Sequence, residues 1–433
     1  MARNNPLPVT TAPAFEHTLR RYVRVATVVM AFMLLDEVLA RVLETADIRF
    51  PSSVAGMLLL FFGLSALHRL RPTAADRLYT LAEPGVRFLG RWMALFFVPP
   101  LVVLPVAALP GSGDLWKLGV IMMAGFVFTL TTTAWMVKAL SGRKIDVPPE
   151  ALPEPDRNGP PKRLLLFWVG TALISALAWT HLSGTIWAVC FFLSITVVGF
   201  LLGLFLQHRA VSKGPLLLIT SRLLHPVVLS AVLAAATIEA TGYSYASYLR
   251  PDVNAYGPGN LLMALLNPAV IALGFLLYRE RMLLIRFARE ILVSIGVAAL
   301  LSLFTATFAA RLLAVSTPYA LAVIPRSVTT PIAIPIAEIL GANPGITAAF
   351  VVLTGVLGAI FGQMLLDFIS KENPVVRGAA MGAASHGIGT AALVSTEPAS
   401  AAVSGVAFAL MGAISSLAVS IPPVFEALIR IVS

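Results

Sequence analysis

Long apolar runs separated by short polar segments recur along this chain from about residue 25 to its C-terminus. Many of them reach the roughly 20 residues that an α-helix needs to cross the hydrocarbon core of a bilayer. The expected helices cover residues 25–44, 53–68, 86–109, 117–140, 164–182, 185–206, 215–240, 261–278, 287–313, 318–340, 345–369, 377–395 and 399–425. The pattern predicts an all-α polytopic membrane protein with about 12–13 transmembrane helices.

Composition and charge agree with this fold class. Charged residues make up 12% of the chain and hydrophobic residues 58%, whereas soluble domains carry about 25% charged residues. The net charge of +10 comes from Arg and Lys in short segments between apolar runs, where they set orientation by the positive-inside rule. We therefore expect a lipid bilayer around the chain, the N-terminus on the inside and no nucleic-acid partner.

One segment is rich in proline and charge, and it divides the chain. Residues 141–163 read SGRKIDVPPEALPEPDRNGPPKR, a composition typical of a semi-rigid linker. The sequence thus predicts a four-helix membrane domain at 1–140, a linker on the cytosolic side at 141–163, and a larger membrane domain at 164–433.

Two segments interrupt the apolar runs of the C-terminal part. Residues 325–335 read PRSVTTPIAIP, and residues 378–390 read GAAMGAASHGIGT. Broken backbone is tolerated at membrane depth only where it is buried in protein or lines a watery cavity, and many secondary transporters build substrate sites from such helices. Gly and Pro are also common in ordinary membrane helices, where small residues serve packing, so that alternative stays open. The similar stretches 343–362 and 397–417 that follow the two segments suggest an inverted repeat.

Several motifs resemble known families. IPRSVTTPIA, ILGANPGITAAFVVLTGVLGA and RGAAMGAASHGIGTA, all within 321–395, resemble LrgB, and FPSSVAGMLLLF (50–61) and WMALFFVPPLV (92–102) resemble LrgA/CidA. The chain is thus similar to an LrgA–LrgB fusion, the arrangement of plastid glycolate/glycerate translocators and of microbial single-chain relatives. It departs from LrgB relatives at two places. Residues 267–278 read NPAVIALGFLLY where relatives commonly have a glycine-proline-alanine segment with a second proline downstream, and Ala392 stands where many relatives carry Arg.

This resemblance implies a secondary transporter that moves small monocarboxylates such as glycolate, glycerate, lactate or pyruvate by alternating access. The alternative that the same families imply is a holin/antiholin-like protein that regulates murein hydrolases and lysis. We expect no enzymatic activity and no cofactor or metal. We also expect a homodimer or higher homo-oligomer formed through the LrgA-like half, in a bacterial inner membrane or, in a photosynthetic eukaryote, in the plastid inner envelope.

A small hydroxy acid offers one negative charge and one hydroxyl, so its site needs N–H or hydroxyl donors and one cation. The candidate substrate-binding residues are Asn267, Arg326, Ser327, Thr329, Thr330, Ser385, His386, Gly387 and Thr390. We expect the site to be lined by 265–275, 325–335 and 382–392, with the LrgA-like half as a scaffold. For the hydroxyls, hydrogen bonding to carbonyls within their own helices is the alternative role.

His386 is the candidate for proton coupling, because an imidazole changes charge near neutral pH. The alternative is a neutral histidine that holds the helix break by donating to a carbonyl. We expect no acidic pair near the broken segments, which argues against strong Na⁺ coupling.

Overall fold

The computed structural model describes residues 12–96, 98–104, 110–141, 162–182, 184–210, 225–249, 251–252, 255–394 and 396–432. The first helices are α1 (Ala12–Thr45), α2 (Ser52–Leu70), α3 (Pro72–Phe96), α4 (Pro99–Val102), α5 (Ser112–Ser141), α6 (Lys162–Leu182), α7 (Thr185–Ala210), α9 (Pro226–Thr241) and α10 (Tyr245–Tyr248). They are followed by α11 (Pro258–Met263), α12 (Leu266–Arg279), α13 (Arg281–Arg286), α14 (Ala288–Leu312), α15 (Thr317–Val323), α16 (Thr330–Leu340) and α17 (Pro344–Leu357). The last elements are the π-helix η3 (Gly358–Gly362), α18 (Gln363–Ile369), α19 (Pro374–Leu393), α20 (Pro398–Ser420) and α21 (Pro422–Val432).

The predicted fold class is confirmed. Apart from one pair of two-residue strands, β1 (Pro251–Asp252) and β2 (Ala255–Tyr256), every regular element of the described residues is helical. Nine helices in the described ranges are long and apolar enough to cross a membrane, so the chain is an integral membrane protein. Four further helices match predicted apolar runs without being uninterrupted apolar spans. Of these, α9 and α16 are short, α19 is interrupted, and α1 carries Asp36 and Glu37.

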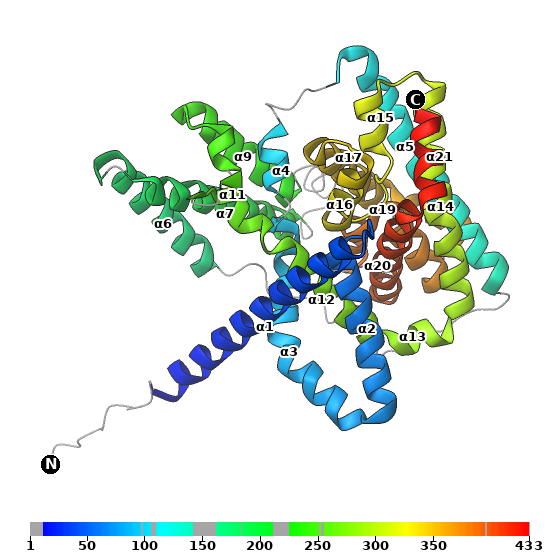
Figure 1. Ribbon diagram of the computed structural model, residues 1–433, viewed down its shortest axis with the longest axis horizontal. Helices are drawn as coiled ribbons and strands as arrows, with labels where there is room; N and C mark the ends of the chain where they lie inside the picture. The colour runs from blue at the N-terminus through cyan, green and yellow to red at the C-terminus, as the bar shows by residue number, and fades with distance from the viewer. Residues whose placement is uncertain are drawn as a thin grey trace.

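The helices gather in groups that do not follow the order of the chain (Figure 1). Helices α6, α7 and α9 lie together at one edge, and α14 to α21 lie together toward the opposite edge. Helix α5, although it comes early in the sequence, packs against α14 and α19 in the second group. One buried apolar cluster therefore joins Phe126 of α5 to Met381 of α19, and a second cluster joins Phe192 of α7 to Tyr278 of α12. Burial of these faces, rather than sequence proximity, positions α5 beside the broken helices.

The helix boundaries differ most from the expected ones at the starts of α1 and α3. Helix α1 begins at Ala12, whereas its apolar run begins near residue 25. Helix α3 begins at Pro72, whereas the apolar run that predicted it begins near residue 86. The added turns of α3 carry polar residues such as Asp76 and bury only one side, through Ala75 and Ala82, so hydropathy alone did not reveal them. Residues 142–161 of the predicted linker and 215–224 of the seventh predicted run lie outside the described residues.

Candidate functional site

Helix α19 is a hairpin whose two arms are separated at His386. This residue has φ 44° and ψ −143°, a left-handed conformation that costs a non-glycine residue about 1–3 kcal/mol. Before the break, a Cβ built on Gly382 would lie 2.5 Å from the carbonyl oxygen of Ser404 in α20. After the break, the hydroxyl of Thr390 is hydrogen-bonded to the hydroxyl of the same Ser404 at 2.7 Å. Because both arms meet α20 at the same level, the chain reverses direction at His386.

The first broken segment forms a second hairpin from α15 and α16. Residues 324–329 separate the two helices, and Pro325 and Pro331 prevent one continuous helix because each lacks a backbone donor. The first arm runs along α5, since Ser316 ahead of α15 is hydrogen-bonded to Asp114 and Arg326 lies beside Gly125, eleven positions further along α5. The second arm leads away from the tip to α17.

The two hairpins enter from opposite ends of α5. Near its start, Lys117 donates to the carbonyl oxygen of Ala314, just ahead of α15, at 2.8 Å. Near its end, Lys138 donates to the carbonyl oxygen of Ile369, ahead of α19, at 2.9 Å. Two broken helices that enter from opposite sides are the arrangement expected of an inverted repeat.

The hairpin tips, residues 324–329 and 385–387, face each other. A Cβ built on Gly387 would lie 3.9 Å from Oγ1 of Thr329. Thr329 precedes α16 and its side chain makes no capping hydrogen bond there. The hydroxyl of Ser327 accepts a hydrogen bond from Ser302 of α14 at 2.8 Å. Thus most residues predicted for the site converge on one region where the tips, α5 and α14 meet.

Arg326 is the cation of this region. Its side chain is fully buried, and Nη1 donates to the carbonyl oxygen and the hydroxyl of Ser302, each at 3.2 Å. Its Nε and Nη2 atoms are buried without a hydrogen-bond partner, and within the described part of the chain no carboxylate is paired with it. Nε–H and Nη2–H are the two parallel donors on one edge of a guanidinium, the geometry that binds a carboxylate in a bidentate manner.

His386 and its neighbouring hydroxyls hold the second tip. The imidazole Nε2 donates to the carbonyl oxygen of Val351 in α17 at 2.9 Å, and Ser385 donates to the carbonyl oxygen of Met381 at 2.8 Å. Thr390 donates to the carbonyl oxygen of His386 at 2.8 Å. These contacts follow the structural alternatives considered from the sequence, in which His386 and the hydroxyls bond to backbone carbonyls.

Two predicted residues stand out from this group. Thr330, the first residue of α16 beside the first tip, is fully buried and its hydroxyl has no hydrogen-bond partner. Asn267, in contrast, donates to Asp36 of α1 at 2.8 Å, and Asp36 also accepts from Ser52 of α2. The amide of Asn267 thereby joins α1, α2 and α12, and the structure does not bring it together with the other candidates.

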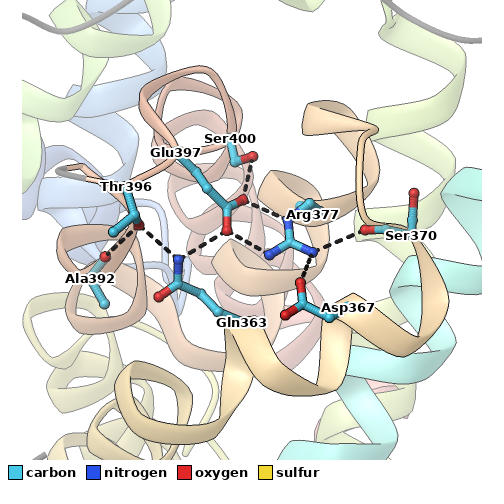
Figure 2. Close-up of polar contacts among 8 residues, drawn as sticks. All are labelled: Gln363, Asp367, Ser370, Arg377, Ala392, Thr396, Glu397 and Ser400. Atoms are coloured by element: carbon cyan, nitrogen blue, oxygen red, sulfur yellow. Dashed lines mark hydrogen bonds and ion pairs between the residues drawn. The ribbon is translucent and has the colours of Figure 1, made fainter. Parts of the chain in front are cut away.

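An ionic cluster at the base of the second hairpin was not found from the sequence. Figure 2 shows Arg377, whose Nε and Nη2 donate to the carboxylate of Glu397 at 2.6 and 2.5 Å, while Nη1 donates to Asp367 at 2.8 Å. Gln363 also donates to Glu397, at 2.9 Å. The expectation that no acidic pair lies near the broken segments is therefore wrong, because the reversal of α19 brings Asp367 and Glu397 to one arginine.

The charge of Glu397 is stabilised in this cluster. Burial alone would raise its pKa, but the hydrogen bonds from Arg377 and Gln363 and the charge of Arg377 outweigh burial and hold the pKa below its ordinary value. Ser400 also donates to this carboxylate, at 2.9 Å. With Arg377 between them, neither Glu397 nor Asp367 is a free carboxylate for a sodium ion. The cluster instead closes the base of the hairpin by joining both ends of α19 to α18.

Comparisons with known proteins agree with this architecture. The LrgB-like family model matches residues 196–423, and the LrgA family model matches residues 33–137. Plastidal glycolate/glycerate translocator 1, chloroplastic, from Arabidopsis thaliana is 31% identical over 415 residues, which cover 92% of this chain and 78% of the relative.

Two bacterial relatives match shorter parts. The uncharacterized protein YwbG of Bacillus subtilis is 34% identical over 152 residues, which cover 35% of this chain and 68% of the relative. An uncharacterized protein of Haemophilus influenzae is 30% identical over 224 residues, covering 52% and 90% respectively. No solved structure matches. The family match over more than half of the chain, together with the near full-length similarity to a translocator, shows that this protein belongs to the LrgB-like family and carries an LrgA-family region in the same chain.

Proposed function

We propose that this protein is a secondary transporter of small monocarboxylates, such as glycolate, glycerate, lactate or pyruvate, that works by alternating access. Its similarity to a translocator suggests a transporter rather than an enzyme. The observation that carries the proposal is Arg326, a fully buried arginine with two adjacent unpaired donors where two opposed hairpin tips meet. An ion that is buried without a partner destabilises a protein by several kcal/mol. A ligand that supplies the missing carboxylate removes this penalty, so its binding is favoured.

The chemistry around Arg326 fits one carboxylate and little more charge. The Nε–Nη2 edge provides two parallel donors, and the unpaired hydroxyl of Thr330 provides a donor or acceptor for a 2-hydroxyl or 2-keto oxygen. Among the described residues that surround the tips, Arg326 is the one permanent cation, because an arginine stays charged at all working pH values whereas the imidazole of His386 carries no permanent charge. A dicarboxylate would bring a second charge that no partner balances there. The site therefore favours a monocarboxylate.

The opposed hairpins suggest how access alternates. Each tip lies beside the middle of α5, at Gly125 and Phe126, and each hairpin is anchored at its own end of α5. Movement of one hairpin opens the tip region to one side while the other hairpin keeps it closed, as in transporters with inverted repeats. We propose further that the LrgA-family region mediates assembly into a homodimer or higher homo-oligomer.

Counterflow in proteoliposomes tests the substrate class. Vesicles that contain the purified protein are loaded with unlabelled glycolate and diluted into labelled glycolate, with glycerate, lactate, pyruvate, succinate or malate as competitors. We expect the four monocarboxylates to compete and the two dicarboxylates not to compete. If succinate or malate competes while all four monocarboxylates fail, the proposed substrate class is wrong, and release of every solute regardless of its charge would indicate a pore.

A further inference from the structure

Helix α5 passes directly over the unpaired edge of Arg326. A Cβ built on Gly125, in the middle of α5, would lie 2.1 Å from Nη2, and 2.6 Å from both Nε and Cζ of Arg326. These distances are far below any contact that a real Cβ makes, so only glycine at this position lets the guanidinium lie where it does. The atoms that would collide include the two that have no hydrogen-bond partner.

The same helix also touches the second hairpin region. Phe126, the next residue of α5, is fully buried, and its ring would lie 3.4 Å from a Cβ built on Gly358 of η3. The same Cβ would lie 2.0 Å from the Cβ of Ser385, which belongs to the tip of the second hairpin. At adjacent positions, α5 therefore meets the cation of the first tip and the π-helix that packs against the second tip.

The ends of α5 are fixed to the segments that precede the two hairpins. Asp114 and Lys117 hold the chain ahead of α15, through Ser316 and Ala314. Lys138 holds the chain ahead of α19 through the carbonyl oxygen of Ile369. The contacts at both ends and in the middle give α5 a fixed axial register against both hairpins, and this register places Gly125 opposite Arg326.

We propose that α5, which belongs to the LrgA-family region, forms a wall of the anion site, and that Gly125 is a positioning residue for Arg326. The LrgA-family region is then part of the transport unit and more than a scaffold. In this conformation the backbone at Gly125 covers the Nε–Nη2 edge, so α5 and the first hairpin separate slightly when a carboxylate binds. This inference rests on the proposed function, since it assigns a substrate carboxylate to Arg326.

Substitution of glycines along α5 tests the inference. Gly125→Ala introduces the colliding Cβ, whereas Gly119→Ala, on the same helix, places its Cβ where nothing lies within 4 Å. We expect Gly125→Ala to raise the KM of glycolate counterflow about ten- to a hundredfold, and Gly119→Ala to leave it unchanged. Counterflow by Gly125→Ala with the KM of the unsubstituted protein would overturn the inference.

A double variant keeps the test informative if Gly125→Ala does not fold. Arg326→Ala removes the guanidinium, so Gly125→Ala should cause no further loss of thermal stability in that background. If Gly125→Ala lowers the Tm of the purified protein equally with and without Arg326, the collision is not with this side chain and the inference falls. If neither the unsubstituted protein nor Gly119→Ala shows counterflow, the proposed function is refuted. The contact between Gly125 and Arg326 would still be tested in that case, by comparing the loss of Tm that Gly125→Ala causes with and without Arg326.

Discussion

Glu397→Gln is the substitution whose effect the structure defines most closely, because it acts on the cluster of Figure 2. The side chain of Arg377 is 5% exposed, that of Glu397 is 20% exposed, and the two are joined by two short charge-assisted hydrogen bonds. Breaking a fully buried pair by removing one partner destabilises a protein by about 3–5 kcal/mol, and an exposed pair contributes less than about 1 kcal/mol. Since Arg377 keeps Asp367 and the carbonyl oxygen of Ser370, we expect a loss of about 2 kcal/mol.

The lowered pKa of Glu397 also predicts how the stability of Glu397→Gln changes with pH. The pKa of Glu397 is lowered in the folded protein, so its ionised form stabilises the fold fully above the ordinary glutamate value of about 4.3. That contribution is lost as the pH falls through the lowered value in the folded state. In Glu397→Gln this part of the acid-induced loss should be missing, so the stability of the variant falls less steeply with pH than that of the unsubstituted protein.

Thermal unfolding of the purified protein in detergent, followed at neutral pH and across the acid range, measures both effects. Glu426→Gln is the matched control, because Glu426 is an exposed carboxylate on α21 and surface substitutions usually change stability by less than about 0.5 kcal/mol. If Glu397→Gln unfolds like Glu426→Gln at neutral pH, or loses stability in acid as steeply as the unsubstituted protein, the cluster does not hold the hairpin base.

Three further predictions concern the remaining candidates. His386→Gly should be more stable than His386→Ala by about 1 kcal/mol in thermal unfolding, because φ 44° is unstrained only for glycine; an equal Tm would contradict the strained tip. His386→Gln should lower counterflow and proton-driven accumulation together, since Nε2 holds the tip through Val351; selective loss of accumulation in vesicles with a pH gradient would assign it the proton instead. Asn267→Ala should lower stability by about 1 kcal/mol and leave the KM for glycolate unchanged, because its amide is bonded to Asp36; a raised KM would place it in the site.

The membrane fold was predictable from one-dimensional patterns, since apolar length and proline or glycine interruptions are local properties of the sequence. Hydropathy identified the apolar spans, and the motifs around Arg326 and His386 identified the two tips. Hydropathy did not predict the polar first half of α3, because this part has one buried face and no continuous apolar run. The reversal of α19 at His386 was not predictable either, since Gly382 and Thr390 reveal it only through their common contact with Ser404.

The contacts that define the site connect residues far apart in the sequence. Gly125 lies about two hundred positions before Arg326, and nothing in the α5 sequence distinguishes it from Gly119. The Arg377 cluster had a visible signal, because Asp367 and Glu397 border apolar runs on either side of this arginine at intervals of ten and twenty residues. A straight helix of twenty residues would separate Arg377 from Glu397 by about 30 Å, so their pairing could be predicted only if α19 were already known to reverse.

The most direct test of the central claim is counterflow by Arg326→Gln. Loss of the paired charge-assisted donors should raise the KM for glycolate by about a hundredfold or more, while Arg289→Gln, which removes an exposed cation from α14, should leave the KM unchanged. Both variants are compared at equal amounts of folded protein in the same vesicles. A raised KM in Arg326→Gln alone is the result predicted by a carboxylate bound at the hairpin tips. An unchanged KM for glycolate in Arg326→Gln would contradict it.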